Sequence, residues 1–401
     1  MEQIDICHQI GGLSWQQIRD LTHGEPAFFY ERAQIATRIA DLRSALPQGL
    51  HLAYSLKANP FAPLVGLVLN QLDGADVTSI NEMIEAMNAG TAPRDIMFAG
   101  PAKKPEELRA ALAMGVGICV ESLREMAMLA ELARERDTRA RVLLRLNPEF
   151  SLTGASMRMG GAPTQFGLNT DDLPQVWELL ADPHLHFTGI HIYWGSQCLS
   201  EDAIFQAQET SVDLIESLIP HFPNPPEILN LGSGFGIPYF AKDTALDLPL
   251  IGRNFVPLYD RLQALFHGVS VFLELGRYMV GEAGTYVSNV VDTKMSHGVE
   301  FIVTDGGMHH FLAASGNLGQ KIRRNYPLVV LPADTRSAEI TEQSYQVVGA
   351  LCTPIDLLGH RLTGPEVKVG DMIGIRCAGA YGKSASPLDF LSHAHPREFI
   401  V

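Results

Sequence analysis

The hydrophobic pattern of the chain changes near residue 278. Before that point, short apolar runs alternate with longer segments that have room for a helix. Eight of these runs have the near-continuous hydrophobicity of strands buried on both faces of a parallel sheet. They occupy residues 51–59, 75–79, 95–100, 117–122, 141–147, 187–195, 227–234 and 269–277. Eight strand-then-helix units predict an α/β fold, a (β/α)8 TIM barrel whose functional residues follow the C-terminal ends of the strands.

Two of the intervening segments carry clear helix signals. Residues 80–90 have apolar positions at helical spacing and end at Gly90, whereas residues 105–117 start with Pro105 and stop at Gly115. Proline and glycine are favoured at these two ends of a helix. The segment between residues 148 and 186 is too long for a single crossover. It contains MRMGGAPTQFG, a loop that we expect to cover the site.

Beyond residue 278, strand-like runs follow one another with turn residues between them and little helical periodicity. These runs are TYVSNVVDTK, EFIVTDGG, SYQVVGALC, DMIGIRCAGAYG and REFIV. They predict a C-terminal antiparallel β domain. We therefore expect a barrel over residues 28–277 and a β domain built from residues 1–27 and 278–401.

Composition narrows the class of protein. Of 401 residues, 46% are hydrophobic and 19% charged, and 45 acidic against 30 basic residues give a net charge of −15. With no Lys/Arg tract, such a chain is a poor partner for nucleic acid or an anionic membrane. It has no apolar stretch of bilayer-spanning length and no signal-peptide pattern. The scattered Cys7, Cys119, Cys198, Cys352 and Cys377 lack CxxC spacing and indicate a reducing compartment. We expect a cytoplasmic enzyme.

Lys57 is the first candidate for chemistry, because it follows the first barrel strand in the sequence YSLKANP. A lysine at an apolar strand end is costly to bury, and burial lowers its pKa towards nucleophilic use. Alternatively, the side chain extends from the strand end into solvent. Position alone leaves both interpretations open.

Two further candidates follow the last two barrel strands. The run LGSGFG, residues 231–236, is neither the dinucleotide fingerprint nor a P-loop. It is either a tight turn or a phosphate cradle, since phosphate sites are common in that corner of a barrel. Glu274 and Arg277 form either a simple salt bridge or two contacts to one ligand, with Arg277 on a phosphate. In the β domain, Cys352 and Tyr381 alone would be taken as packing residues.

Taken in order, these motifs resemble the fold-type III pyridoxal-phosphate decarboxylases, which include the diaminopimelate and ornithine decarboxylases. The resemblance runs nearly from end to end. Its segments include YSLKANP, DVTSINEMIEAMNAG, LLRLNPEF, GIHIYWGSQ, LNLGSGFGIPY, ELGRY, TDGGMHH, LCTPIDLLG and AGAYG. It implies an alanine-racemase-like barrel and PLP-dependent decarboxylation of an amino acid. It also implies a homodimer in which one subunit's barrel and its partner's β domain share each active site.

The resemblance gives Lys57 the role of Schiff-base lysine for pyridoxal 5'-phosphate (PLP) and Cys352 that of catalytic acid near the substrate α-carbon. Glu274 then bonds the pyridine nitrogen, so that the ring accepts the electrons left when CO2 departs. The other implied cofactor-binding residues are Asp76, Arg145, His191, Tyr193, Ser196, Gly232, Ser233, Gly234, Phe235, Gly236, Gly276, Arg277 and Tyr381. The implied substrate-binding residues are Thr353, Arg323 and Tyr326.

Three positions depart from the general family pattern. Tyr193 replaces a histidine that stacks on the pyridine ring, and Leu275 replaces a proline. Thr353 follows the catalytic cysteine where enzymes of free diamino acids have an acid that receives the distal ammonium. A hydroxyl cannot replace that charge-assisted bond. Asp356 is either a substitute for the missing acid or a residue that caps its loop.

The same departures resemble a narrower group, the decarboxylases of carrier-linked or citryl-conjugated amino acids, such as the glutamyl-[acyl-carrier-protein] decarboxylase of butirosin biosynthesis. We expect a substrate of this kind. The alternative is a free diamino acid, as in diaminopimelate decarboxylase. A racemase is disfavoured by Glu274, and a PLP-binding regulator by the complete set of catalytic residues. The histidines at 309–310 and 393–395 lack a nearby Cys or Asp cluster, so we expect no metal site.

Overall fold

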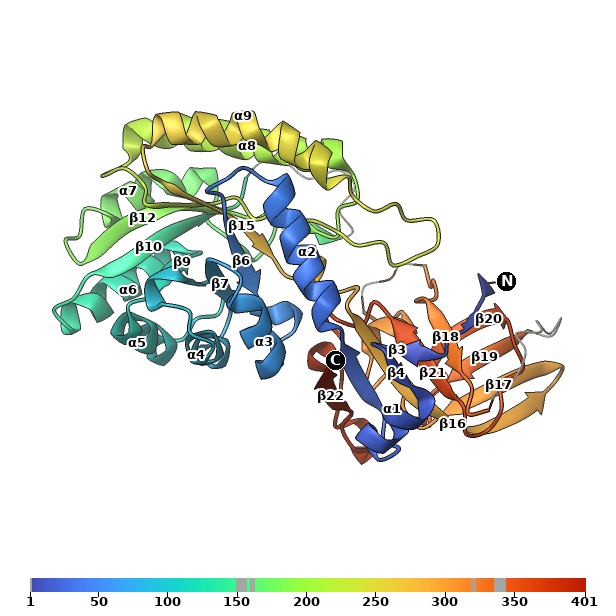
Figure 1. The fold of residues 1–401 in the computed structure, drawn as a ribbon. Helices are drawn as coiled ribbons and strands as arrows, with labels where there is room; N and C mark the ends of the chain where they lie inside the picture. The colour runs from blue at the N-terminus through green and yellow to red at the C-terminus, as the bar shows by residue number, and fades with distance from the viewer. Residues whose placement is uncertain (1, 149–156, 159–162, 319, 321, 335–343) are drawn as a thin grey trace. The chain divides into compact units, whose positions relative to one another are not determined.

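The computed structural model of the chain describes residues 2–148, 157–158, 163–318, 320, 322–334 and 344–401. The chain forms two compact units, which are described separately (Figure 1). The barrel unit comprises Ala36–Ile237 and Thr244–Tyr278, and the β unit comprises Met1–Ile35, Pro238–Asp243 and Met279–Val401. None of the described helices is long and apolar enough to cross a membrane.

Parallel strands close the barrel unit into a ring, and β15 pairs with β6 to complete it. In ring order the strands are β6 (His51–Ser55), β7 (Gly74–Val77), β8 (Ile96–Phe98), β9 (Gly117–Val120), β10 (Ala140–Leu146), β12 (Leu185–Ile192), β14 (Ile228–Asn230) and β15 (Ser270–Leu275). Each of them overlaps a predicted apolar run, and β7, β10 and β12 begin one or two residues earlier than predicted, so the barrel prediction is confirmed. Small and apolar side chains form a core cluster in the barrel: Ala53, Met97, Ala99, Cys119, Leu143, Ile228 and Phe272.

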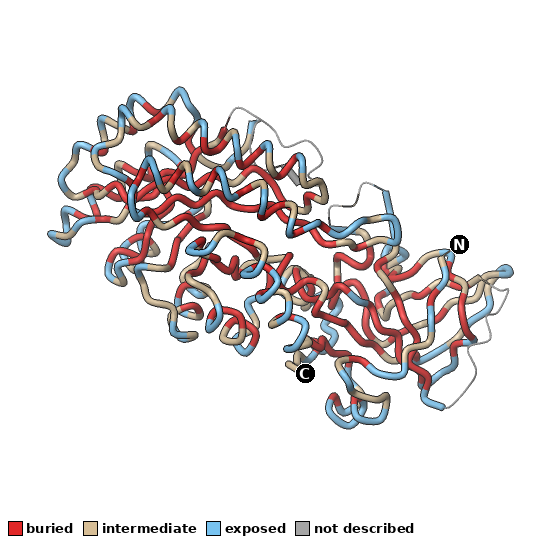
Figure 2. Tube along the Cα trace, turned by 45° about the horizontal axis from the view of Figure 1, so that its top comes forward, coloured by how far each residue is buried: buried red, intermediate tan, exposed pale blue. Residues whose placement is uncertain are grey.

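Helices surround these strands, and Figure 2 shows their buried positions turned toward the barrel wall. The helices are α2 (Arg32–Ala45), α3 (Ala62–Leu69), α4 (Ile80–Asn88), α5 (Pro105–Met114), α6 (Leu123–Glu135), α7 (Leu173–Leu179), α8 (Glu201–Leu218), α9 (Leu248–Leu265) and the short α10 (Arg277–Val280). Helix α5 begins at Pro105 and ends at Gly115, whose φ of +78° suits glycine. Helices α8 and α9 lie side by side (Figure 1).

The long segment between β10 and β12 contains β11 (Met157–Arg158) and α7, and β11 pairs in antiparallel orientation with β13 (Gly195–Ser196), which follows β12. Part of the loop MRMGGAPTQFG, residues 159–162, lies outside the described residues. Whether that loop covers the site therefore stays a prediction.

Within its described residues, the β unit is built on a sheet of ten strands. They are β1 (Glu2–Gln3), β2 (Asp5–Ile6), β5 (Ala27–Tyr30), β16 (Gly284–Ser296), β17 (Val299–Thr304), β18 (Leu328–Leu331), β19 (Tyr345–Val348), β20 (Leu357–Thr363), β21 (Met372–Arg376) and β22 (Arg397–Ile400). A hairpin of β3 (Gln9–Ile10) and β4 (Leu13–Ser14) precedes helix α1 (Trp15–Thr22). A C-terminal β domain is confirmed, but the sheet is mixed, because β1–β20, β2–β18, β5–β22 and β17–β19 pair in parallel.

Strand β5 shows why the β unit is built from separate stretches of the chain. It pairs with β16 and β22, so residues 28–30 belong to the β unit although the sequence pattern places them with the barrel. Phe29 is fully buried in the apolar core of the β unit with Ile18, Val287 and Met372. Residues 238–243 also cluster with this unit. Strand pairing of this kind joins segments hundreds of residues apart.

Candidate active site

Lys57 lies just after β6, in the short 3-10 turn Leu56–Ala58. Its Nζ donates a hydrogen bond of 3.1 Å to Asp76 Oδ2 on β7 and lies 3.6 Å from Glu274 Oε1 on β15. Both carboxylate side chains are 1% exposed, whereas the lysine side chain is 32% exposed. The strands β15, β6 and β7 are neighbours in the ring, and this adjacency brings the three charges together.

The two buried carboxyl groups differ in acidity. Burial and the negative charge of Glu274 raise the pKa of Asp76 well above its usual value. Burial alone would also raise the pKa of Glu274, but the positive charges of His191 and Lys57 outweigh it and hold that pKa well below its usual value. The pair therefore favours an ionised Glu274 beside an Asp76 that retains its proton more readily.

Three polar neighbours fix the Glu274 carboxylate. Ser55 Oγ donates to Oε1 at 3.1 Å, and Asn230 Nδ2 donates to Oε2 at 3.2 Å. His191 Nε2 lies 2.9 Å from the same Oε2. The carboxylate thus has partners from β6, β12 and β14, which hold it in one orientation. Sequence reasoning missed Ser55 and Asn230, although Asn230 stands directly before the glycine turn.

Tyr193 follows β12 at the position where the family pattern has histidine. The Nζ of Lys57 lies 5.5 Å from the centroid of its ring. The phenol therefore lies beside the reactive amine and presents an aromatic face for stacking without an imidazole's capacity for proton transfer.

The glycine turn after β14 is tightly packed. Gly232 has a φ of +59° and Gly234 a φ of +70°, a left-handed conformation that favours glycine. A Cβ at Gly234 would lie 2.7 Å from the Trp194 ring. Ser233 Oγ donates to the backbone oxygen of Glu274 at 2.6 Å, which ties the turn to β15. Phe235 and Gly236 continue the turn, and the backbone N–H of Gly236 donates to Cys198 O at 2.8 Å.

The remaining predicted barrel residues are close in sequence to these elements. Gly276 follows β15, and a Cβ there would lie 2.9 Å from the Cβ of Ala58, beside Lys57. Arg277 begins α10. Ser196 lies in β13 and is 8% exposed. These positions alone do not show a contact with a ligand, so the cofactor-binding roles of Gly276, Arg277 and Ser196 stay predictions.

Arg145 belongs to a buried charge network that the sequence did not reveal. Its Nη1 donates to Glu121 Oε1 at 2.9 Å, and the same oxygen accepts from the N–H of Gly100 at 2.6 Å. Close by, Lys103 Nζ lies 2.8 Å from Glu125 Oε1, and only 1% of the lysine side chain is exposed. The residues that form these pairs stand more than twenty positions apart, which no local pattern records.

These side chains open into one cavity of about 280 Å³ at the C-terminal ends of the strands. It is lined by Lys57, Asp76, Thr78, Ala99, Gly100, Pro101, Ala102, Lys103, Glu107, Arg145, Phe166, His191, Tyr193 and Glu274. The structure therefore brings together six of the barrel residues that the sequence analysis proposed. The cavity combines an amine nucleophile, an ionised carboxylate and an aromatic face.

The candidate residues of the β unit lie in its loops. Cys352 is exposed in a turn after β19, and Thr353 follows it. Asp356 in the same loop is 2% exposed, and its Oδ1 and Oδ2 accept hydrogen bonds from Met308 N and Leu351 N at 2.6 and 2.8 Å. Asp356 therefore joins two loops of the fold. Of the two interpretations left open by the sequence, the geometry favours the loop cap.

The other three predicted residues of the β unit are Tyr381, Arg323 and Tyr326, and the structure shows their backbone conformation or their contacts within the protein. Tyr381 has a φ of +53°, which is uncommon for a residue with a side chain. Arg323 Nη2 donates to the backbone oxygens of Ser315 and Leu357. Tyr326 is 7% exposed and packs on aromatic rings, with centroids 5.0 Å from Tyr239, 5.3 Å from Phe311 and 6.0 Å from Phe240. Their contacts to cofactor or substrate stay predictions.

The paired histidines do not form a metal centre with the groups around them. His309 and His310 are 0% and 2% exposed, and burial lowers their pKa values to about 4 and about 3. Among the residues that the structure describes, no group of three or more His, Cys, Asp or Glu side chains could hold a metal ion.

Comparison with known proteins decides what this arrangement is. The family described as "Pyridoxal-dependent decarboxylase, pyridoxal binding domain" matches residues 32–281, and the "C-terminal sheet domain" of the same decarboxylases matches residues 190–379. The chain belongs to the pyridoxal-dependent decarboxylases. It is an amino acid decarboxylase with PLP as cofactor, as the motifs predicted.

Individual relatives cover nearly the whole chain. The decarboxylase is 35% identical over 378 residues to the L-glutamyl-[BtrI acyl-carrier protein] decarboxylase of Niallia circulans, across 94% of this chain and 88% of that one. It is 30% identical over 394 residues to the 2-[(L-alanin-3-ylcarbamoyl)methyl]-2-hydroxybutanedioate decarboxylase of Staphylococcus aureus, across 96% of each. The crystal structure of Helicobacter pylori diaminopimelate decarboxylase complexed with L-lysine has a TM-score of 0.84 and 25% identity, covering 96% of this chain and 94% of that one.

The residues in the barrel cavity fit PLP. Lys57 supplies the amine that the cofactor's aldehyde requires, and the low pKa of Glu274 leaves an anion for a protonated ring nitrogen. The buried Nδ1 of His191 has no hydrogen-bond partner among the described residues, as expected of a group that a ligand completes. Glycine at positions 232 and 234 lets the turn pack closely on the residues after β12, since a Cβ there would lie 2.8 Å from the Tyr193 ring or 2.7 Å from the Trp194 ring. Backbone N–H groups in such a turn can bind the oxygens of a phosphate.

Proposed function

We propose that this decarboxylase removes the α-carboxyl group of an amino acid whose distal end is conjugated, through an amide or a thioester, rather than being a free ammonium. The observation that carries the proposal is that the Asp356 carboxylate is already engaged by backbone N–H groups of its own fold. Thr353 offers no charge after Cys352, and the carboxylate of Asp356 is buried and accepts two backbone hydrogen bonds. Asp356 is therefore poorly placed to receive a distal ammonium.

The activities of two relatives support this substrate class. One acts on an L-glutamyl group on an acyl-carrier protein, and the other on an amide conjugate of 2-hydroxybutanedioate. Both substrates have an extension where a diamino acid has its second ammonium. Diaminopimelate decarboxylases are also among the relatives, at up to 30% identity, and they define the alternative.

For the reaction, Lys57 would hold PLP covalently, while the glycine turn, Arg277 and Tyr381 would hold its phosphate. When bound, PLP supplies an electron sink for the bond that breaks as CO2 leaves. Glu274, kept ionised by His191 and Lys57, would hold the proton on the ring nitrogen. Tyr193 would restrain the ring by stacking. Cys352 would then donate a proton to the α-carbon.

A CO2-release assay tests the substrate class. Purified enzyme loaded with PLP is given free diamino acids, a carrier-linked amino acid and a citryl-linked diamino acid in parallel. We expect release from at least one conjugate at a kcat/KM at least tenfold above that of any free diamino acid. Preference for a free diamino acid would overturn the proposal and restore the diaminopimelate-type alternative.

We further propose a homodimer in which Cys352 of one subunit serves Lys57 of its partner. Lys57→Ala and Cys352→Ala homodimers should both be impaired, because each site lacks one group. A mixed dimer collects both lesions in one site and leaves the other intact, so complete random exchange should restore about a quarter of wild-type activity. A chain carrying both substitutions, mixed with either single mutant, is the control and should restore none. If exchange is demonstrated and activity does not return, Cys352 serves its own chain.

A further inference from the structure

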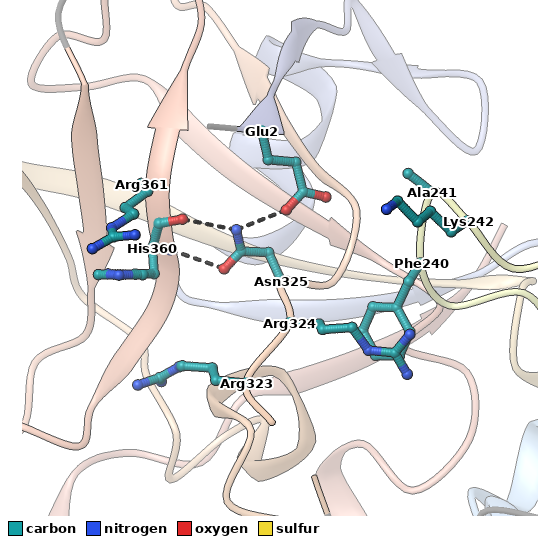
Figure 3. A pocket seen from close by; sticks show the side chains of 9 residues that line it. All are labelled: Glu2, Phe240, Ala241, Lys242, Arg323, Arg324, Asn325, His360 and Arg361. Atoms are coloured by element: carbon teal, nitrogen blue, oxygen red, sulfur yellow. Dashed lines mark hydrogen bonds between the residues drawn. The ribbon is translucent and has the colours of Figure 1, made fainter. Parts of the chain in front are cut away.

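A second cavity lies wholly within the β unit and has a volume of about 370 Å³. Its lining residues are Glu2, Phe240, Ala241, Lys242, Arg323, Arg324, Asn325, His360 and Arg361 (Figure 3). Four of them are basic and one is acidic, in a chain whose net charge is −15. We call this cavity the basic pocket. Of its residues, only Arg323 appears among the predicted substrate contacts.

Asn325 organises the centre of the basic pocket. Its Nδ2 donates to Glu2 Oε2 at 2.8 Å and to His360 O at 2.9 Å, and its Oδ1 accepts from His360 N at 2.9 Å. These bonds join β1, β20 and the loop before β18. One of these bonds also occupies an oxygen of Glu2, the single acid that lines the pocket, so Glu2 helps to hold Asn325 in place.

The positive side chains flank Asn325 on two sides. In Figure 3, Arg323, His360 and Arg361 lie to one side, and Phe240, Arg324 and Lys242 lie to the other. The guanidinium carbon of Arg324 lies 3.6 Å from the centroid of the Phe240 ring, which fixes it by stacking. Arg323 is fixed by its bonds to Ser315 O and Leu357 O. Immobilised guanidinium groups bind an anion at a lower cost in conformational entropy.

Two features on the side of His360 and Arg361 indicate that a ligand completes the pocket. The Nδ1 atom of His360 is buried and has no hydrogen-bond partner among the described residues. Arg361 has a φ of +52°, a conformation that costs free energy for a residue with a Cβ and that collects at ligand sites. Burial, together with the charges of Arg361 and Arg323, lowers the pKa of His360. Asp243 Oδ1 lies 3.5 Å from Arg324 Nη1 and offsets part of that guanidinium's charge. The charges of Arg323, Arg361 and Lys242 still outnumber the single acid of the lining.

We propose that the basic pocket binds a ligand that carries oxyanion groups. Guanidinium groups match the geometry of phosphate and carboxylate oxygens, and Lys242 adds a mobile positive charge. That the ligand is the anionic tail of the conjugated substrate rests on the function proposed above. Two tails have this chemistry: the phosphate of a phosphopantetheinyl arm and the carboxylates of a citryl group.

Binding is tested first, without turnover. Calorimetry on the PLP-loaded enzyme, so that the cofactor's own phosphate site is filled, uses phosphopantetheine, citrate and inorganic phosphate as probes. We expect saturable binding of phosphopantetheine or citrate that weakens with added salt. Arg324→Gln and Arg361→Gln should each weaken it about tenfold, the usual effect of losing one charge-assisted hydrogen bond. Lys242→Gln, which removes an exposed side chain, provides a second variant with little risk to folding.

Lys294→Gln is the matched control, because it removes an exposed lysine of the same unit at a distance in sequence from every pocket residue. It should leave binding unchanged. The inference is overturned if neither organic probe binds, or if the pocket variants and Lys294→Gln bind them equally.

Kinetics then distinguish the two tails. Arg361→Gln should raise KM for whichever conjugate supplies the anion, with kcat and the PLP absorption spectrum close to wild type. An effect on the carrier-linked substrate alone identifies phosphate, and an effect on the citryl conjugate alone identifies carboxylate. If wild type uses neither conjugate, the proposed function fails while the binding result still decides the pocket. If wild type uses a conjugate and Arg361→Gln and Arg324→Gln use it equally well, the pocket inference fails alone.

Discussion

Asp76 and Glu274 place two buried carboxyl groups against one amine, 3.1 and 3.6 Å from Lys57 Nζ, and their pKa values are shifted in opposite directions. Pairs of titratable groups whose environments separate their pKa values often mark acid–base assignments in enzymes. Here the separation keeps the negative charge on Glu274, which His191, Asn230 and Ser55 also stabilise. The cavity thus has one fixed anion before any ligand enters.

The raised pKa of Asp76 predicts a pH-dependent effect of Asp76→Asn on apoenzyme stability. Ionising Asp76 is harder in the folded state, so the wild type loses stability as pH rises from about 3.9, the unfolded pKa, through the higher folded pKa. The variant has no such loss. Its unfolding free energy relative to wild type should therefore increase with pH across that window and then level off, as measured by urea unfolding. A difference that is flat with pH would contradict the assigned shift.

Glu274→Gln should change the unfolding free energy with pH in the opposite direction. A lowered folded pKa contributes stability above the unfolded pKa, and that contribution is lost as pH falls through the folded pKa. The variant should be less stable than wild type near neutrality, and the two should converge in acid. If stability relative to wild type changed with pH in the same way in Asp76→Asn and Glu274→Gln, the pKa values of the two carboxyl groups would not be shifted in opposite directions.

Lys57 should be the lysine that holds PLP. The same cavity is lined by Lys103, whose Nζ lies 2.8 Å from Glu125 Oε1 and donates to Gly100 O at 2.6 Å. Those contacts occupy the ammonium group of Lys103, whose side chain is 1% exposed, whereas that of Lys57 is 32% exposed. Borohydride reduction followed by peptide mapping should place the pyridoxyl group on the peptide of residues 54–60. Lys57→Met should lose the label and Lys104→Met, at an exposed lysine, should keep it; a label on Lys103 would refute the mechanism.

Replacing the fixed anion should disable the electron sink. In Glu274→Arg, a positive charge beside the ring nitrogen opposes its protonation, and decarboxylation should fall about 10²–10⁴-fold, as is usual for groups that act in proton-related steps. PLP content, read from absorbance, separates loss of cofactor from loss of rate. A PLP-loaded variant within a few-fold of wild type would show that Glu274 does not set the protonation of the ring.

The barrel was predictable from sequence because its signal is local. Each strand coincides with or overlaps a short apolar run, and Lys57, Asp76 and Glu274 stand within two residues of the C-terminal ends of β6, β7 and β15. Ring closure then brings them together. The mixed pairing of the β unit was not predictable, since β5 joins β16 and β22 from far along the chain. Strands β18 and β20 were also missed, although Pro327 and Pro332 bracket LVVL and Gly364-Pro365 follows LLGHRLT.

The buried ion pairs escaped prediction for another physical reason. Arg145 on β10 pairs with Glu121 after β9, and Lys103 in a loop pairs with Glu125 on α6. A charged residue in a sequence is first taken as solvated. Only the fold shows that these charges are buried and compensated. The basic pocket likewise draws Glu2, Lys242 and Arg361 from opposite parts of the chain.

Asp356 should matter for stability rather than for substrate choice. Its carboxylate joins two loops through Met308 N and Leu351 N, and in Asp356→Asn the amide NH2 would face one of these donors. The variant should lose about 1.5–3 kcal/mol of unfolding free energy in urea titration. Asp389→Asn, at a side chain that is 97% exposed, is the control and should lose little. A change in preference between free and conjugated amino acids, with stability intact, would make Asp356 a substrate contact.

Thr353→Asp should move specificity towards free diamino acids. A carboxylate after Cys352 pairs with a distal ammonium, and it is left as an unpaired charge when the substrate ends in an amide. The ratio of kcat/KM for a free diamino acid to that for a conjugate should therefore rise about tenfold or more, since one charge-assisted hydrogen bond is gained. Ile355→Asp adds the same charge two positions away, at a side chain that is 48% exposed, and controls for a general electrostatic effect. Equal responses of both variants, or of neither, would show that Thr353 does not line the specificity pocket.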